Sequence, residues 1–277
     1  MKWILLYSLL WLFSTTCFAQ NSLLQLSVSH QRDTSRLFSG IDDFNVQRLE
    51  SRLRIPTLAI SSYVGTWYSG FELTENRFVL SGSVNDTRRF YRFAAPFEFE
   101  VRPSGKWQHV FYYAPSYYSD ESLIDQTRYV NEFSWLVKYK ANRKARWVIG
   151  VRQDTRFGAK SMYPVFGLES RPNSKLFHHW VFPDMYSHMT LNKKIGIRVF
   201  AKPNGGNWRY LQEGGGEASF GMTDWNMGVA WFQALRHPLQ LKIEGGLKML
   251  GEGSVAGNDG ELEDGYFFLI SLQTKLL

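Results

Sequence analysis

The chain has 277 residues, a formal net charge of +7 and a sequence pI of about 9.4. Its basic residues are dispersed rather than gathered in a long run, which excludes a DNA- or RNA-binding arm, and we expect no nucleic-acid partner. Aromatic residues make up 16% of the chain, which is more than a polar-surfaced soluble domain readily places. A transmembrane β-barrel uses such residues at both lipid–water borders.

Residues 1–19 have the features of a cleaved secretory signal peptide. Lys2 gives a positive start, and residues 3–13 are apolar and uncharged. Small residues stand three and one positions before the expected cut ahead of Gln20. The apolar run is too short for a helix that spans a membrane. We therefore expect one mature domain over residues 20–277.

The only cysteine, Cys17, lies within this signal. The mature chain is therefore expected to have no disulfide bond and no thiol nucleophile. An exported chain without disulfides fits the periplasm or outer membrane of a Gram-negative bacterium.

Alternation of apolar and polar residues, with the period of two that a strand requires, predicts strands along most of the remaining chain. In chain order the predicted strands cover residues 22–30, 46–55, 60–71, 88–101, 107–117, 129–139, 147–156, 162–169, a run between turns near 173 and 193, then 195–202, 223–235, 239–249 and 266–277. No helical periodicity is long enough to predict a helix. The sequence therefore predicts an all-β protein.

Short turns and long polar loops alternate between these strands. The turns fall near residues 103, 143, 173, 193 and 237, and the loops near 31–45, 72–87, 118–128, 213–222 and 251–264. Bacterial outer-membrane barrels have short periplasmic turns and longer extracellular loops. We therefore expect an antiparallel up-and-down transmembrane barrel with an even number of strands, about 14 if the chain turns near Pro183 and about 12 if that proline only bends one strand.

The alternation also assigns the two faces of the wall. Five apolar sets are expected to face lipid: Leu49, Leu53 and Ile55; Phe97 and Phe99; Trp135 and Val137; Ile195, Ile197 and Val199; Leu241 and Ile243. The opposite positions are polar and carry more Lys and Arg than Asp and Glu, so we expect an excess of positive charge in the lumen.

The last strand has an apolar face from Tyr266 to Leu276. It resembles the signal that the outer-membrane insertion machinery reads, although the chain ends in Leu277 rather than in Phe or Trp. The expected partners are that machinery, outer-membrane lipid and lipopolysaccharide. The expected location is the outer membrane of a Gram-negative bacterium.

The central stretch, residues 146–210, resembles an uncharacterised family of outer-membrane β-barrels catalogued as domain of unknown function 6268. The resemblance rests on six segments: Asp154-Thr155-Arg156-Phe157-Gly158, Tyr163-Pro164-Val165-Phe166-Gly167-Leu168-Glu169, Arg171-Pro172-Asn173, Phe182-Pro183, Tyr186 and Gly205-Gly206-Asn207-Trp208. It implies an outer-membrane barrel. It implies no activity, ligand or catalytic residue.

One constellation stands out as a candidate site. Arg152, Asp154 and Arg156 would face the lumen from one strand, about 7 Å apart at successive inward positions. They could form a constriction or bind an anion. The alternative is that they are paired internally with acids on other strands, since buried charges need partners. The acids available for this pairing are Glu98, Glu100 and Glu132.

Enzymatic and metal chemistry find little support in the sequence. His178 and His179 are adjacent and would point to opposite faces of a strand, so they do not chelate one ion easily. The chain has no Gly-x-Ser-x-Gly elbow for a lipase serine. We expect no enzyme, no metal and no cofactor.

Two functional classes remain for a barrel of this kind. One is a porin-like pore or transport barrel for small solutes, with a weak preference for anions. The other is a closed, plugged barrel that has a structural or surface-recognition role. A soluble periplasmic β-domain is the less favoured third alternative.

Overall fold

The computed structural model describes residues 26–39, 44–82, 86–103, 105–120, 128–211, 217–236, 238–255 and 258–274. The predicted signal peptide, with Cys17, lies outside these residues. The described residues form strands and turns, and no helix among them is long and apolar enough to cross a membrane.

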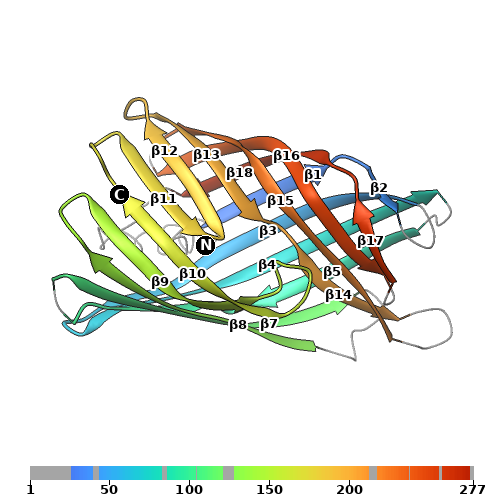
Figure 1. The fold of residues 1–277 in the computed structure, drawn as a ribbon, viewed down its shortest axis with the longest axis horizontal. Helices are drawn as coiled ribbons and strands as arrows, with labels where there is room; N and C mark the ends of the chain where they lie inside the picture. Colours follow the sequence, from blue (N-terminus) through green and yellow to red (C-terminus); the bar gives the residue numbers. More distant parts are fainter. Residues whose placement is uncertain are drawn as a thin grey trace, which may run out of the picture.

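The strand segments form one antiparallel sheet that closes on itself (Figure 1). They are β1 (Ser27–Asp33), β2 (Arg36–Ser39), β3 (Phe44–Ser61), β4 (Gly65–Gly82), β5 (Asp86–Ala94), β6 (Phe97–Val101), β7 (Trp107–Asp120), β8 (Arg128–Lys140), β9 (Ala145–Asp154), β10 (Ser161–Ser170), β11 (Leu176–Phe182), β12 (Asp184–Thr190), β13 (Ile195–Pro203), β14 (Gly206–Leu211), β15 (Glu217–Ala234), β16 (Leu239–Val255), β17 (Asn258–Leu262) and β18 (Gly265–Thr274). The first and last segments, β1 and β18, pair with each other, and this pairing closes the sheet.

Some segments are halves of one strand. The pairs β1 and β2, β5 and β6, β13 and β14, and β17 and β18 each follow one another along the same neighbouring strands. Counted in this way the wall is a closed up-and-down barrel of 14 strands. The prediction of an even-numbered antiparallel barrel is confirmed. So is the turn near Pro183, because β11 and β12 form a separate hairpin around it.

The outer face of the wall is apolar. On β9, Trp147 and Ile149 are 57% and 65% exposed, whereas Val148 between them is buried on the inner face. Trp135, Phe97 and Val199 are also exposed. Exposing so many apolar side chains to water would cost free energy, whereas the same surface is compatible with contact with lipid.

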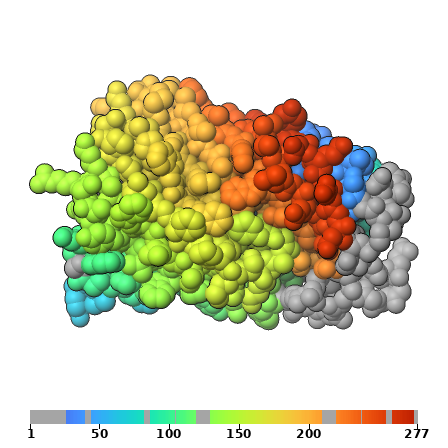
Figure 2. Space-filling model, in the orientation of Figure 1, coloured from blue at the N-terminus to red at the C-terminus, as the bar shows by residue number. Residues whose placement is uncertain are grey.

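The two ends of the barrel differ. The turns that follow β3, β6, β8, β10, β12 and β15 lie at one end, which we call the turn end (left in Figure 1). The opposite end we call the loop end. Strands β3, β4 and β15 have 18 residues each, but β11 and β12 have only 7 each and stay in the half near the turn end (Figure 1). We call the side of the wall formed by β11 and β12 the low flank; its side chains, yellow in Figure 2, are closely packed from strand to strand.

Several predicted loops are strands instead. Residues 31–39 belong largely to β1 and β2, residues 72–82 complete β4, and residues 251–255 complete β16. Conversely, the strand predicted over 60–71 contains the turn between β3 and β4. At the loop end the strands continue beyond the apolar band of the outer face. The outward residues of these extensions are polar, so the extensions resemble loops in sequence.

The loop end is filled by apolar side chains that point inward. We call this cluster the apolar plug; its members are Phe38, Phe44, Val46, Phe78, Phe90, Trp208, Phe220, Met222 and Leu262. Ring centroids of Phe78 lie 4.7 Å from Trp208 and 4.8 Å from Phe220, which are on the opposite side of the wall. Because β9–β12 stop short of this level, fewer strands surround it, and β14 contacts β7. A narrow barrel is filled by its own side chains.

Candidate functional site

The other half of the barrel holds a cavity of about 1380 Å³ that we call the vestibule. Its lining includes Arg143, Lys144 and Arg171 at the turns, so it opens at the turn end. None of the plug residues lines it. The vestibule is therefore a cup that ends inside the barrel, below the apolar plug.

The vestibule is strongly basic. Its described lining contains thirteen Lys or Arg residues and four Glu residues. The cations are Arg52, Arg54, Arg102, Lys138, Arg143, Lys144, Arg146, Arg156, Arg171, Lys175, Arg198, Lys202 and Lys242, and the acids are Glu50, Glu98, Glu100 and Glu169. Four more acids, Glu72, Asp154, Asp184 and Glu244, pair with five of these cations from just outside the lining. A concave, low-dielectric wall of one sign raises the local concentration of the opposite ion. The lumen is basic, as the sequence predicts.

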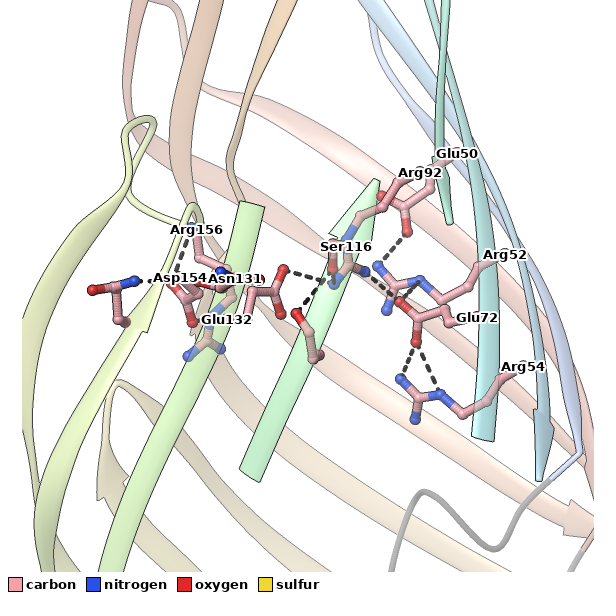
Figure 3. Close-up of polar contacts among 12 residues, drawn as sticks. Glu50, Arg52, Arg54, Glu72, Arg92, Ser116, Asn131, Glu132, Asp154 and Arg156 are labelled. Atoms are coloured by element: carbon pink, nitrogen blue, oxygen red, sulfur yellow. Dashed lines mark hydrogen bonds and ion pairs between the residues drawn. The ribbon is translucent and has the colours of Figure 1, made fainter. Parts of the chain in front are cut away.

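Between the vestibule and the plug lies a layer of ion pairs, which we call the charged layer (Figure 3). On its β3 side Arg54 donates to Glu72 at 2.5 and 3.0 Å, and Arg52 donates to Glu50 at 2.9 Å. Arg92 then donates to both Glu72 and Glu132, each at 2.6 Å. The network thus runs from β3 and β4 through β5 to β8.

Arg152, Asp154 and Arg156 form the opposite side of the charged layer. Arg152 and Asp154 face inward from β9, as predicted, but β9 ends at Asp154 and Arg156 lies in the following loop. The prediction that all three share one strand is therefore wrong. The Arg156 side chain nevertheless returns to the row, because it donates to Asp154 at 2.8 Å and to Asp184 at 2.7 Å.

Asp184, at the start of β12, is the partner that sequence reasoning missed. It accepts hydrogen bonds from both Arg156 and Arg152, the latter at 3.0 Å. Tyr163 donates to Asp154 at 2.7 Å and accepts from Arg156 at 2.8 Å. Asp184 directly follows Pro183, and only the hairpin turn there brings it back over β9 and β10. The row is internally paired, with two arginines against two aspartates.

The three glutamates considered as partners of this row lie elsewhere. Glu132 pairs with Arg92, and Glu100 accepts from Gln108 at 2.9 Å and lies 3.4 Å from Arg102. Glu98 and Glu100 line the vestibule on β6. Among the three, only Glu132 belongs to the charged layer.

A second buried group lies on the β16 side. Lys248 contacts Asp33 at 2.6 Å and Asp224 at 3.1 Å, and Asp224 also accepts from Arg36 at 2.8 Å. These side chains are at most 2% exposed. Two cations against two acids make a neutral group next to Met222 of the plug. The floor of the vestibule is therefore held by paired charges.

Two of the described histidines each lie beside a serine. His178 and Ser187 are 2.8 Å apart on the outer face, and so, at 3.0 Å, are His30 and Ser51. In the described part of the chain neither histidine contacts a carboxylate that would orient it, as a hydrolase triad requires. No group of three or more His, Cys, Asp or Glu residues among the described positions is arranged to hold a metal.

No family model and no curated protein matches the chain. Several solved structures are similar in fold, including the following three. The COG4313 outer membrane channel from Pseudomonas putida F1 is 9% identical, with a TM-score of 0.45, and the match covers 90% of this chain and 94% of that one. The P. putida toluene transporter TodX is 6% identical, with a TM-score of 0.42 and coverages of 91% and 89%. The translocator domain of the autotransporter NalP from Neisseria meningitidis is 8% identical, with a TM-score of 0.40 and coverages of 99% and 95%. The closed antiparallel wall with its apolar outer face makes this chain a β-barrel of the outer-membrane type.

Proposed function

We propose that the protein is an outer-membrane channel of a Gram-negative bacterium for small anionic solutes, closed at the loop end in this conformation. The preponderance of cations over acids in the lining of the vestibule carries this proposal. Rings of Arg and Lys are how anion-selective pores are built. The resemblance of residues 146–210 to the 6268 family is consistent with this location and is silent on the solute.

The vestibule would open to the periplasm. Bacterial barrels keep their short turns on the periplasmic side, and the vestibule opens at the turn end. Insertion by the outer-membrane machinery and contact with lipopolysaccharide follow from the same placement. An anion in the vestibule would therefore be exchanged with the periplasm while the loop end stays closed.

Passage would require the apolar plug to open. Hydrophobic constrictions gate pores by excluding water, and the plug packs aromatic rings of β4, β14 and β15 against one another at the loop end. The same plug, with its paired charged layer, favours a second candidate: a barrel that stays closed and presents only its outer loops and vestibule.

Conductance of the purified chain in a planar bilayer separates these candidates. We expect the wild type to be silent for most of the time, and a variant with a hollowed plug, Phe78→Ala with Trp208→Ala, to conduct steadily. Its reversal potential under a salt gradient should indicate a preference for chloride over potassium. A silent variant that is fully folded would favour the closed barrel, and a cation-selective one would contradict the proposed solute class.

A further inference from the structure

Arg198, on β13, is an unusual cation among the inward arginines and lysines of the barrel. Arg52, Arg92, Arg152, Arg156 and most of the others have a carboxylate partner. Within the described residues Arg198 makes no hydrogen bond and no ion pair, and its Nε is buried without a partner. A buried donor left unsatisfied costs free energy, so the site gains from any group that supplies an acceptor.

Two aromatic rings fix this guanidinium in place. Its Cζ lies 4.3 Å from the ring centroid of Tyr186 on β12 and 4.8 Å from that of Phe232 on β15. Cation–π contacts hold such a group without using its N–H donors. His179 stacks on Tyr186 with centroids 4.9 Å apart, and His188 packs against Phe232 at 5.3 Å. The clamp orients Arg198 but leaves its hydrogen-bonding capacity free.

Arg198 faces the vestibule rather than the packed positions beside it. Gly196 precedes it on the same face of β13, where the ring of His188 fills the space that a side chain would take, and Ala230, opposite it on β15, is fully buried. Arg198, Tyr186 and Phe232 all line the vestibule. A solute in the vestibule therefore has access to the arginine.

The surrounding charge is positive. Glu244, on β16, is opposite Ala230 and accepts from Lys242 at 2.9 Å and Lys202 at 3.3 Å. One carboxylate is thus shared by two ammonium groups, and Arg198 adds a third cation. The group carries three positive charges and one negative, an excess of two.

We propose that Arg198 is the centre of a binding site for a phosphate-type oxyanion, with Lys202 and Lys242 as flanking cations. A guanidinium with free N–H donors binds two oxygens of one oxyanion side by side, which an ammonium does not. The excess of two charges matches a dianion better than a monoanion. The inference rests on the proposed function in that it assigns the anionic solute to one place in the vestibule.

Calorimetric titration of the full chain, refolded in detergent micelles, with inorganic phosphate at low ionic strength and pH 8 tests this site. The wild type should bind phosphate saturably, and more tightly than it binds acetate. Arg198→Gln should weaken phosphate binding about tenfold or more, the scale of one lost charge-assisted, two-point contact.

Arg146→Gln is the matched control. It makes the same substitution and the same charge change in the lining of the same vestibule, but near the turn end and away from the aromatic clamp. Its phosphate affinity should stay within about twofold of the wild type, because exposed charges are screened and act weakly. Heat-modifiable gel migration establishes that each variant is folded. Tyr186→Leu, which keeps every charge but removes half of the clamp, should weaken binding by an intermediate factor.

Two results would overturn the site: no saturable phosphate binding by the wild type, or equal losses in Arg198→Gln and Arg146→Gln. Either can occur while the barrel with the hollowed plug still conducts anions selectively, in which case the proposed function stands without this site. Conversely, phosphate binding that depends on Arg198, in a barrel that shows no anion preference, would support the site and contradict the channel.

Discussion

The guanidinium of Arg48 lies over the ring of Trp208, with its Cζ 5.3 Å from the ring centroid, while the same group pairs with Glu50. Arg48 and Trp208 are each 4% exposed. Arg48 also donates to Asn76 at 2.9 Å. This contact joins the charged layer to the apolar plug, and it links β3 to β14 across the barrel. The two layers that close the lumen therefore depend on each other.

Trp208→Ala should weaken the closed end. Removing a buried tryptophan from a packed core costs about 3–5 kcal/mol, and here Arg48 also loses its aromatic face. We expect a lower free energy of unfolding in urea and more frequent conducting events. Trp147→Ala, at a tryptophan on the outer face that is 57% exposed, is the control and should cost less without adding conductance. Equal effects of both variants would contradict the role of the plug.

Arg156 and Asp184 should be strongly coupled. Arg156→Gln leaves Asp154 with Tyr163 and Asp184 with Arg152 as their remaining partners, and the loss of a charge-assisted contact of this kind costs about 1.5–3 kcal/mol. The double variant Arg156→Gln with Asp184→Asn should recover part of that loss, because the uncompensated charges are removed together. A double-mutant cycle on the free energy of unfolding measures this coupling. Strict additivity of the two single losses would show that the row is not an internal ion pair.

Neighbouring residues on β8 test the assignment of the two faces. Val137 belongs to the outward set, whereas Leu136 lines the vestibule. Val137→Arg should destabilise the barrel by about 2–4 kcal/mol if it lies near the bilayer centre, and Leu136→Arg should cost less because it meets water. Refolding equilibria in lipid bilayers give both values. A larger cost for Leu136→Arg than for Val137→Arg would mean that Leu136 faces the lipid and Val137 faces the lumen.

Orientation in the membrane can be read from single cysteines, since Cys17 is the only native one and lies in the predicted signal. Asp259→Cys, on β17 at the loop end, should react with an impermeant thiol reagent on whole cells. Asn173→Cys, in a turn at the other end, should react only after the outer membrane is permeabilised. Labelling of Asn173→Cys alone would place the vestibule outside the cell.

The wall could be predicted from the sequence because lipid and water impose a period of two along every spanning strand. Alternation alone assigns Phe97, Trp135 and Val199 to the outer face, and all three are exposed there. The ends of the strands could not be predicted in this way, because the outward residues beyond the lipid are polar and resemble loop residues in sequence. Thus residues 72–82 complete β4 although they read as part of a loop.

The interior was harder to predict because its contacts are distant in sequence. Arg156 and Asp184 meet only because the hairpin at Pro183 reverses the chain, and Arg48 meets Trp208 across the lumen. Arg198 reads as one more lumen cation among many, and the sequence has no signal for its lack of a carboxylate. Inward-facing Phe78, Phe90 and Trp208 could have indicated the plug, because aromatic residues on the lumen side of a water-filled pore are out of place.

The low flank formed by β11 and β12 also concerns the lipid around it. A tilted strand needs about 9–11 residues to cross the hydrocarbon region, and these two strands have 7 each. Phe157 of the β9–β10 loop packs near this edge, with its ring centroid 6.4 Å from those of Phe182 and Trp225. Lipid beside β11 and β12 must therefore shorten, since a mismatch of this kind thins the leaflet locally. The barrel would deform the membrane on one side only, and this gives it a preferred direction for meeting neighbouring proteins in the plane of the membrane.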